Sequence, residues 1–172
     1  MTLPDFDLPR FAEQDQPFHA AGRVWIIPEI HFTTLPDGST GVDGDEIDRI
    51  HTAILNEICG DQAPLTPDEL DFILDATGGS LTELAQLLRM DKSSVSRWRS
   101  GSRSVPSPAS WLIKRWAWYR TFGIEMGARR ASLGRFETDA GFLTYARHQA
   151  IKHGLTVAIT PRMSSGQAAS GG

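Results

Sequence analysis

The sequence predicts a mainly α-helical protein in which a small α+β module precedes a compact helical unit. Three observations lead to this fold class. Apolar residues recur at helical spacing from residue 45 onward, helix start and stop signals alternate at short intervals from residue 64, and β-branched and aromatic residues are concentrated in residues 23–42. A chain of 172 residues with 40% hydrophobic content can bury one substantial core or two small ones.

The N-terminal third divides into three expected segments. Residues 1–22 are rich in Pro, Asp and Gln, and we expect an irregular arm there. Residues 23–42 predict two short strands that can form a hairpin, with a turn at Pro36–Gly38. Pro28 indicates an edge position or a bulge in the first strand. A helix is expected from about Asp45 to Cys59, because isoleucines recur at spacings of three and four at Ile47, Ile50, Ile54 and Ile58.

Helix punctuation is clear from residue 64, and we assign residues 64–124 to one unit of four short helices. In the first helix Thr66 can cap, Pro67 sits at the first position and Glu69 completes a capping box. The later helices are bounded by Gly78–Gly79, by a second capping box of Ser80 and Glu83, and by Asp91, Gly101 and Ser107–Pro108. The side chains expected in the core are Leu70, Ile73, Leu74, Leu84, Leu87, Leu88, Val95, Trp98, Leu112, Ile113 and Trp116.

The C-terminal part predicts a helical extension over residues 125–160, with a helix from about Asp139 to His153. The adjacent pair Arg129–Arg130 is most often solvated, with a second DNA-backbone contact as the alternative. Residues 161–172 are expected to form a disordered tail.

Composition and charge limit the class of protein. The chain has no run of about 18 apolar residues and no secretion signal at its start, so we expect a cytoplasmic protein without a membrane span. Its only cysteine, Cys59, excludes an internal disulfide and a multi-cysteine zinc site, and neither a metal nor a cofactor is expected. Residues 1–63 carry 12 acidic and 3 basic side chains, whereas residues 79–120 carry 2 acidic and 8 basic ones. The local positive charge favours a polyanion partner.

A tight turn around Met90–Asp91 joins two of the predicted helices, and the second is short with small polar residues on one face. This pattern is typical of the helix-turn-helix motif, whose second helix enters the DNA major groove by its N-terminal end. Side chains there must be small or carry donors, because base edges lie close. The predicted base contacts are Lys92, Ser93, Ser96 and Arg97. The predicted backbone contacts are Ser80, Thr82, Ser94, Arg99, Arg103 and Ser104.

The stretch LTPDELDFILDATGGSLTELAQLLRMDKSSVSRWRSGSRSVPSPASWLIKRW resembles the Xre/Cro-type, lambda-repressor-like helix-turn-helix domain of MqsA-like antitoxins and their regulator relatives. The shared pattern is an LTP-E helix, an S-x-LA-LL helix, an S-x-V-S-RW recognition helix and a P-x-P helix start. The resemblance implies a DNA-binding domain, with base-reading positions at Lys92, Ser93 and Arg97 and a phosphate-binding turn at residues 80–82. Leu81 stands where glutamine is usual and Arg99 where an acidic residue is usual. The cysteines of the MqsA zinc ribbon are absent.

These patterns predict a sequence-specific DNA-binding transcriptional repressor, most simply an autorepressor, that binds an inverted repeat in double-stranded DNA as a homodimer. The α+β module, assigned to residues 23–62, and the C-terminal helix are the expected dimerisation or partner-binding segments. The alternative is an antitoxin, or a phage anti-CRISPR-associated regulator, in which one of these regions binds a protein partner. An enzyme is the least favoured class, although Glu29 and His31 resemble an acid–base pair. The dimerisation candidates are Trp25, Ile26, Ile30, Trp118 and Tyr119.

Overall fold

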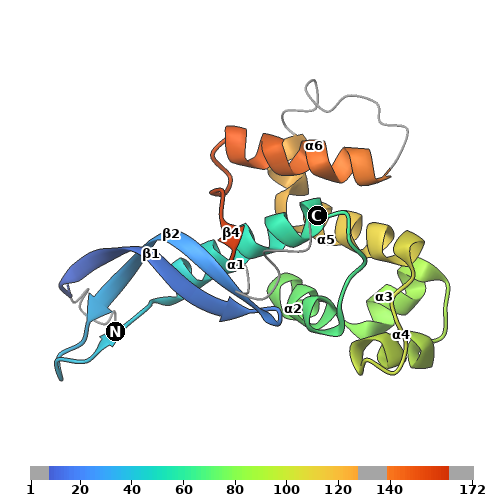
Figure 1. Ribbon diagram of the computed structural model, residues 1–172, viewed down its shortest axis with the longest axis horizontal. Helices are drawn as coiled ribbons and strands as arrows, with labels where there is room; N and C mark the ends of the chain where they lie inside the picture. Colours follow the sequence, from blue (N-terminus) through green and yellow to red (C-terminus); the bar gives the residue numbers. More distant parts are fainter. Residues whose placement is uncertain (1–7, 128–138, 163–172) are drawn as a thin grey trace, which may run out of the picture.

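The computed structural model describes residues 8–127 and 139–162, which form six helices and a small antiparallel sheet (Figure 1). The mainly helical class with a small N-terminal sheet is therefore confirmed. The start of the predicted tail is wrong, because Pro161 pairs with Trp25 in a short strand. The rest of that tail, beyond residue 162, and the Arg129–Arg130 pair lie outside the described residues. The elements in chain order are β1 (Arg10–Ala20), β2 (Arg23–Thr34), β3 (Thr40–Gly41), α1 (Gly44–Gly60), α2 (Pro67–Thr77), α3 (Leu81–Leu88), α4 (Lys92–Arg99), α5 (Ser107–Gly127), α6 (Asp139–Lys152) and β4 (Thr160–Pro161).

The largest departure from the sequence-based expectation is β1, because residues 10–20 were expected to belong to an irregular arm. They pair with β2 in one register along the whole hairpin, from Arg10 opposite Thr33 to Ala20 opposite Arg23. The two loop residues, Ala21 and Gly22, have φ of 54° and 72°, as a type I′ hairpin turn requires. Pairing with an apolar neighbour strand thus overrides the weak strand propensity of Glu, Gln, Asp and Pro.

The hairpin is long but irregular in its middle. Asp15 adopts a left-handed conformation with φ of 51° opposite Pro28, and the ladder is interrupted at that pair. The other edge of β2 carries two short strands, with β4 beside Trp25 and β3 beside Thr33. The expected turn at residues 36–38 connects β2 to β3, so the predicted strand pairing within 23–42 exists but is only two residues long.

A single cluster of buried side chains runs from the sheet through all six helices. Trp25 of β2 and Trp118 of α5 are each 1% exposed or less, and each indole N–H has an acceptor inside the fold. Trp118 donates to Oδ1 of the buried Asn56 at 3.1 Å, which ties α5 to α1. Because Ile30 is buried as well, these three dimerisation candidates are wrong: they belong to the core of one chain.

The helix caps follow the sequence signals in part. The Thr66–Glu69 capping box at α2 is confirmed in both directions. At α3 only half of the expected box is present, because Ser80 Oγ accepts from the Glu83 backbone N–H while the Glu83 carboxylate accepts from Arg120. Asp91 precedes α4 as expected but makes no side-chain cap.

Two expected core positions and one expected length are wrong. Leu87 and Leu112 are about 40% exposed, since α3 and α5 bury only one narrow face each at these turns. Trp116 is half-buried, and the other predicted core positions lie in or against the buried cluster. The last helix of the predicted unit, α5, is 21 residues long rather than short. Its length lets it pack against both α1 and α6, which connects the two halves of the chain.

A buried lysine hydrogen-bonds to the backbone of the segment that connects α1 to α2. Lys114 of α5 is 1% exposed, and its Nζ donates to the backbone carbonyls of Asp61 and Ala63 at 2.5 and 2.7 Å. Burial lowers the pKa of Lys114 from its ordinary value, and the Asp61 carboxylate opposes this shift. The ammonium therefore acts as a capping group for a segment whose carbonyls lack helical partners. No helix among the described residues is both long and apolar enough to span a membrane.

Candidate nucleic-acid interface

The α3–α4 pair is held together by a three-residue turn. Arg89 ends α3 with a left-handed backbone at φ of 51°, and the Met90 N–H closes the turn on the Ala85 carbonyl at 2.9 Å. Many helices end with a residue in this left-handed conformation, which stops the helix sharply. That residue is usually glycine, and a residue with a side chain rarely adopts it. The turn sends the chain directly into α4, where Val95 is fully buried.

The two faces of α4 differ as the sequence predicts. Val95 and Trp98 lie in the core, 0% and 3% exposed. The four candidate base contacts are all exposed on the rest of the helix: Lys92, Ser93, Ser96 and Arg97. Ser94 is partly buried beside them. α4 thus offers solvent a short surface of two hydroxyls and two cations, with no large apolar side chain.

The basic residues of segment 79–120 fall into two classes, which the sequence does not distinguish. Four of the eight have partners inside the chain. Arg99 pairs with Asp71 of α2 at 2.6 Å, Arg120 pairs with Glu83 at 3.1 Å, and Lys114 is buried. The Arg115 guanidinium lies 4.7 Å from the centre of the Phe142 ring.

The other four cations surround α4. Arg89 lies in the turn before it, Lys92 and Arg97 lie on it, and Arg103 lies in the loop after it. All four are exposed, and within residues 8–127 and 139–162 their side chains have no hydrogen bond or ion pair. Unpaired cations are the groups that can neutralise phosphates or donate to guanine without first breaking an internal contact.

Sequence reasoning did not list Arg89 among the candidate DNA contacts. It did list Arg99, whose side chain has an internal partner in the structure. The available signal for Arg89 was its place in the turn between the two helices. The Arg99 guanidinium, predicted to contact the DNA backbone, is half-exposed and bound to Asp71. It can reach a phosphate only by sharing or leaving that partner.

The remaining predicted backbone contacts are exposed and supported by local hydrogen bonds. Ser80 caps α3 through its hydroxyl oxygen, so its O–H remains available as a donor, and Thr82 lies exposed in the same first turn. The loop after α4 is fastened by the Arg103 N–H, which donates to the Arg97 carbonyl at 3.1 Å. Ser104 is exposed in that loop. Helix N-terminal amides and hydroxyls of this kind are common phosphate ligands.

The acidic end of the chain is built differently. The β1–β2 hairpin lies at the opposite end of the molecule from α3 and α4 (Figure 1). At its base Glu46 accepts from Arg49 and from the His31 backbone N–H at 2.9 Å. These bonds, led by the Arg49 contact, lower the pKa of Glu46 to about 2 although burial opposes them. The His31 ring lies 3.7 Å from Glu29 and 3.4 Å from Glu46, so both residues of the expected acid–base pair lie beside the Glu46–Arg49 ion pair.

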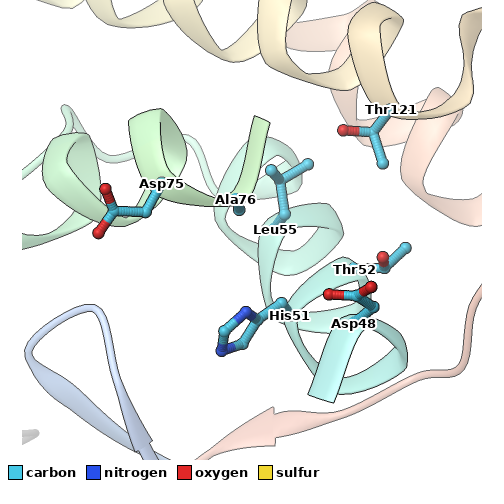
Figure 2. Close-up of a pocket in the computed structure, with 7 residues that line it drawn as sticks. All are labelled: Asp48, His51, Thr52, Leu55, Asp75, Ala76 and Thr121. Carbon is cyan, nitrogen blue, oxygen red and sulfur yellow. The ribbon is translucent and has the colours of Figure 1, made fainter. Parts of the chain in front are cut away.

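A polar pocket of about 310 Å³ lies between α1, α2 and α5 (Figure 2). His51 on its wall contacts the Phe18 and Phe72 rings edge-on. Figure 2 shows the Asp75 carboxylate turned away from His51 and Asp48. The titratable groups of this pocket therefore do not converge on one point, and we assign it no chemistry.

Comparison of the chain with models of protein families, with curated proteins and with solved structures finds no match.

Proposed function

We propose that the protein is a sequence-specific transcription regulator that binds double-stranded DNA through a helix-turn-helix formed by α3 and α4. The proposal rests on how the eight cations of segment 79–120 are arranged. Four lie around α4 and have no hydrogen bond or ion pair to any described residue, whereas the other four have partners inside the chain. A helix kept only for packing has no need of this arrangement. A helix that enters the major groove does need small and cationic side chains on its exposed face.

In the proposed complex α4 lies in the major groove. Arg97 and Lys92 donate to guanine O6 and N7, and Ser93 and Ser96 reach neighbouring base edges or phosphates. Ser80 and Thr82, at the start of α3, hold one phosphate. The loop with Arg103 and Ser104 follows the backbone, and Arg89 adds a contact that the sequence did not predict.

We further propose repression from an inverted repeat, most simply in the protein's own promoter, by a homodimer. The dimer contact must involve residues other than Trp25, Ile30 and Trp118, which are buried within one chain. Of the original candidates, Ile26 is partly buried and Tyr119 is 41% exposed. Leu112, one heptad before Tyr119 on α5, is similarly exposed and extends the same side of the helix.

A second candidate function keeps the DNA-binding unit and adds a protein partner, as in an antitoxin or an anti-CRISPR-associated regulator. The observation that favours it is β1, whose outer edge has no strand partner among the described residues. Exposed strand edges accept an extended segment from another chain. The acidic charge of this region would favour a basic segment.

The decisive experiment is selection of duplexes from a randomised library with the full-length protein, followed by sequencing. Enrichment of one motif, repeated in inverted orientation, is expected. An Arg97→Ala variant should enrich a motif that has lost its preference at one position, and an unchanged preference at every position would contradict the assignment of α4. Arg10→Ala is the matched control, because Arg10 is an exposed cation on β1, far from α4. Light scattering of the free protein at micromolar concentration tests the dimer, and a monomer would contradict the inverted-repeat model.

A further inference from the structure

A groove of about 540 Å³ lies between α6, the end of α1 and β4. Its volume falls within the range of roughly 300–1,000 Å³ that is usual for small-molecule sites. Most of its wall is apolar and comes from residues 158–161 and from Ile151. A second pocket of about 250 Å³ adjoins it, sharing Glu57, Arg147 and Pro161 and reaching Trp25.

Arg147 of α6 stands at the junction of the two pockets and is held in place from several sides. Its Nη1 donates to Glu57 Oε2 at 2.6 Å, and the Glu57 side chain is only 10% exposed. Its stem packs on Gly60 so closely that a Cβ there would lie 2.3 Å from the Arg147 Cδ. The Arg147 backbone carbonyl accepts from the buried Asn56. These contacts fix the guanidinium in one position, so it loses little conformational freedom when a ligand binds.

One edge of this guanidinium remains unused. The Arg147 Nε has no hydrogen-bond partner in the described structure and is buried, so a ligand oxygen that binds it must displace the groups that cover it. Nη2, on the same edge, has only a long contact of 3.5 Å to Nε2 of His148, whose ring is exposed and can rotate. The Nε–Nη2 edge of an arginine matches the two oxygens of a carboxylate in a bidentate pair.

The charges around the groove indicate a ligand with a single negative charge. The Lys152 ammonium lines the groove, is exposed, and has no ion-pair partner among the described residues. Arg147 and Lys152 supply two positive charges, and Glu57 offsets one of them. A dianionic phosphate would leave one charge uncompensated, whereas a carboxylate balances the site.

We propose that this groove binds a small organic carboxylate, with its two oxygens on the Nε–Nη2 edge of Arg147, its charge also facing Lys152, and its apolar body against Ile151 and residues 158–161. Such a ligand satisfies the orphaned Nε–H and fills the apolar part of the groove. Because β4 pairs with β2, an occupied groove also fastens the C-terminal segment to the sheet. The proposal is separate from DNA binding.

The experiment titrates the full-length protein, without DNA, with octanoate and phenylacetate as probes, and with octylamine as a probe of opposite charge. Proton–nitrogen correlation spectra follow the arginine Nε–H signals. We expect a saturable downfield shift of the Arg147 Nε–H with either carboxylate and no such shift with octylamine. The signal of Arg162, an exposed residue directly after β4 that does not line the groove, should stay unchanged. The absence of a shift at millimolar carboxylate, or an equal shift with octylamine, would overturn the proposal.

Two variants separate binding from folding, with thermal unfolding as the check on each. Arg147→Lys keeps the charge but loses the bidentate edge, and octanoate affinity, followed by calorimetry, should fall by at least about tenfold. Ile151→Trp fills the groove and replaces neither member of the Arg147–Glu57 pair, so it should also abolish binding. Folded variants that bind octanoate as the wild type does would refute the site. The matched control, Arg162→Ala, should bind normally.

Discussion

The guanidinium of Arg99 on α4 lies 2.6 Å from the carboxylate of Asp71 on α2, and both side chains are close to half-exposed. The pair joins the proposed recognition helix to the helix that precedes the helix-turn-helix. Arg99 stands at the position where the family that the sequence resembles usually has an acidic residue, and the pair holds this cation in an internal contact. An exposed pair of this kind stabilises the fold by less than about 1 kcal/mol. Its larger effect is on the charge that α4 presents to solvent, and in the proposed complex to DNA.

Asp71→Asn should therefore strengthen DNA binding at low salt. The substitution frees Arg99 and removes one negative charge beside α4, so the salt dependence of binding should steepen by about one counterion per monomer. Fluorescence anisotropy with a non-specific duplex at several salt concentrations measures this slope. Glu13→Gln, which removes an exposed acid from the distant strand β1, is the matched control and should change the slope less. An unchanged slope in Asp71→Asn would mean that Arg99 does not reach phosphate.

Arg97 and Arg103 should differ in what their loss changes. Arg97→Ala should cost roughly 1–3 kcal/mol of operator affinity and relax base preference at one position, because it removes a base contact. Arg103→Ala should weaken all sequences about equally and reduce the salt slope by about one. Gel shifts with the selected operator and with single-base variants of it distinguish the two effects. Unchanged operator affinity in Arg97→Ala would contradict the recognition-helix assignment.

Arg89 combines backbone strain with an unpaired charge, and two substitutions separate them. Glycine adopts the left-handed backbone of position 89 without the steric cost that a side chain brings. Arg89→Gly should therefore stabilise the fold by up to about 1 kcal/mol while weakening DNA binding. Arg89→Ala keeps the strain and loses the charge, so it should weaken DNA binding to the same extent without stabilising. Urea unfolding and anisotropy on the two variants give both quantities. Equal stabilities of the two variants would contradict the strain argument.

Lys114 should make stability rise with pH in the alkaline range. Its pKa in the folded protein is lowered by burial, whereas the unfolded chain has the ordinary value of 10.5. Between the two values the unfolded state binds more protons, so raising the pH through this window favours the folded state. In Lys114→Met the two carbonyls lose their donor, which should cost about 2 kcal/mol at neutral pH. Urea unfolding of both proteins at pH 7 to 10 tests the prediction, since only the wild type should show this gain.

Glu46 should contribute stability that disappears in acid. Its pKa is about 2 in the fold against an ordinary 4.5, so the contribution is complete above pH 4.5 and is lost as the pH falls toward 2. The size is about 2–3 kcal/mol. Glu46→Gln should be less stable than the wild type at pH 6, and the difference should narrow by pH 3. Glu29→Gln, at a half-exposed acid nearby, is the matched control for the loss of one carboxylate.

Local signals were enough to predict α1 to α4, the start of α5 and α6. Caps at Thr66 and Ser80, the glycine after α2 and the isoleucine spacing of α1 act over one or two turns, so they can be read without knowing the rest of the chain. The buried face of α4 could be predicted for the same reason. Sequence reasoning failed where a distant partner decides. The residues of β1 have weak strand propensity, and the strand forms because its backbone pairs with the apolar strand β2. Leu87 and Leu112 are residue types typical of a core, but they stay exposed because no neighbouring element covers them.

The sequence by itself determined which helices form, which residues of α4 can face a polyanion, and where the positive charge lies along the chain. Only the tertiary structure decided which charges are free and which aromatic residues are available. Arg99 and Arg120 have acidic partners 28 and 37 positions away, and Trp25 and Trp118 are both buried in one core. The reason is physical: helix formation depends on neighbours within a few residues, whereas ion pairing and burial depend on distance in space.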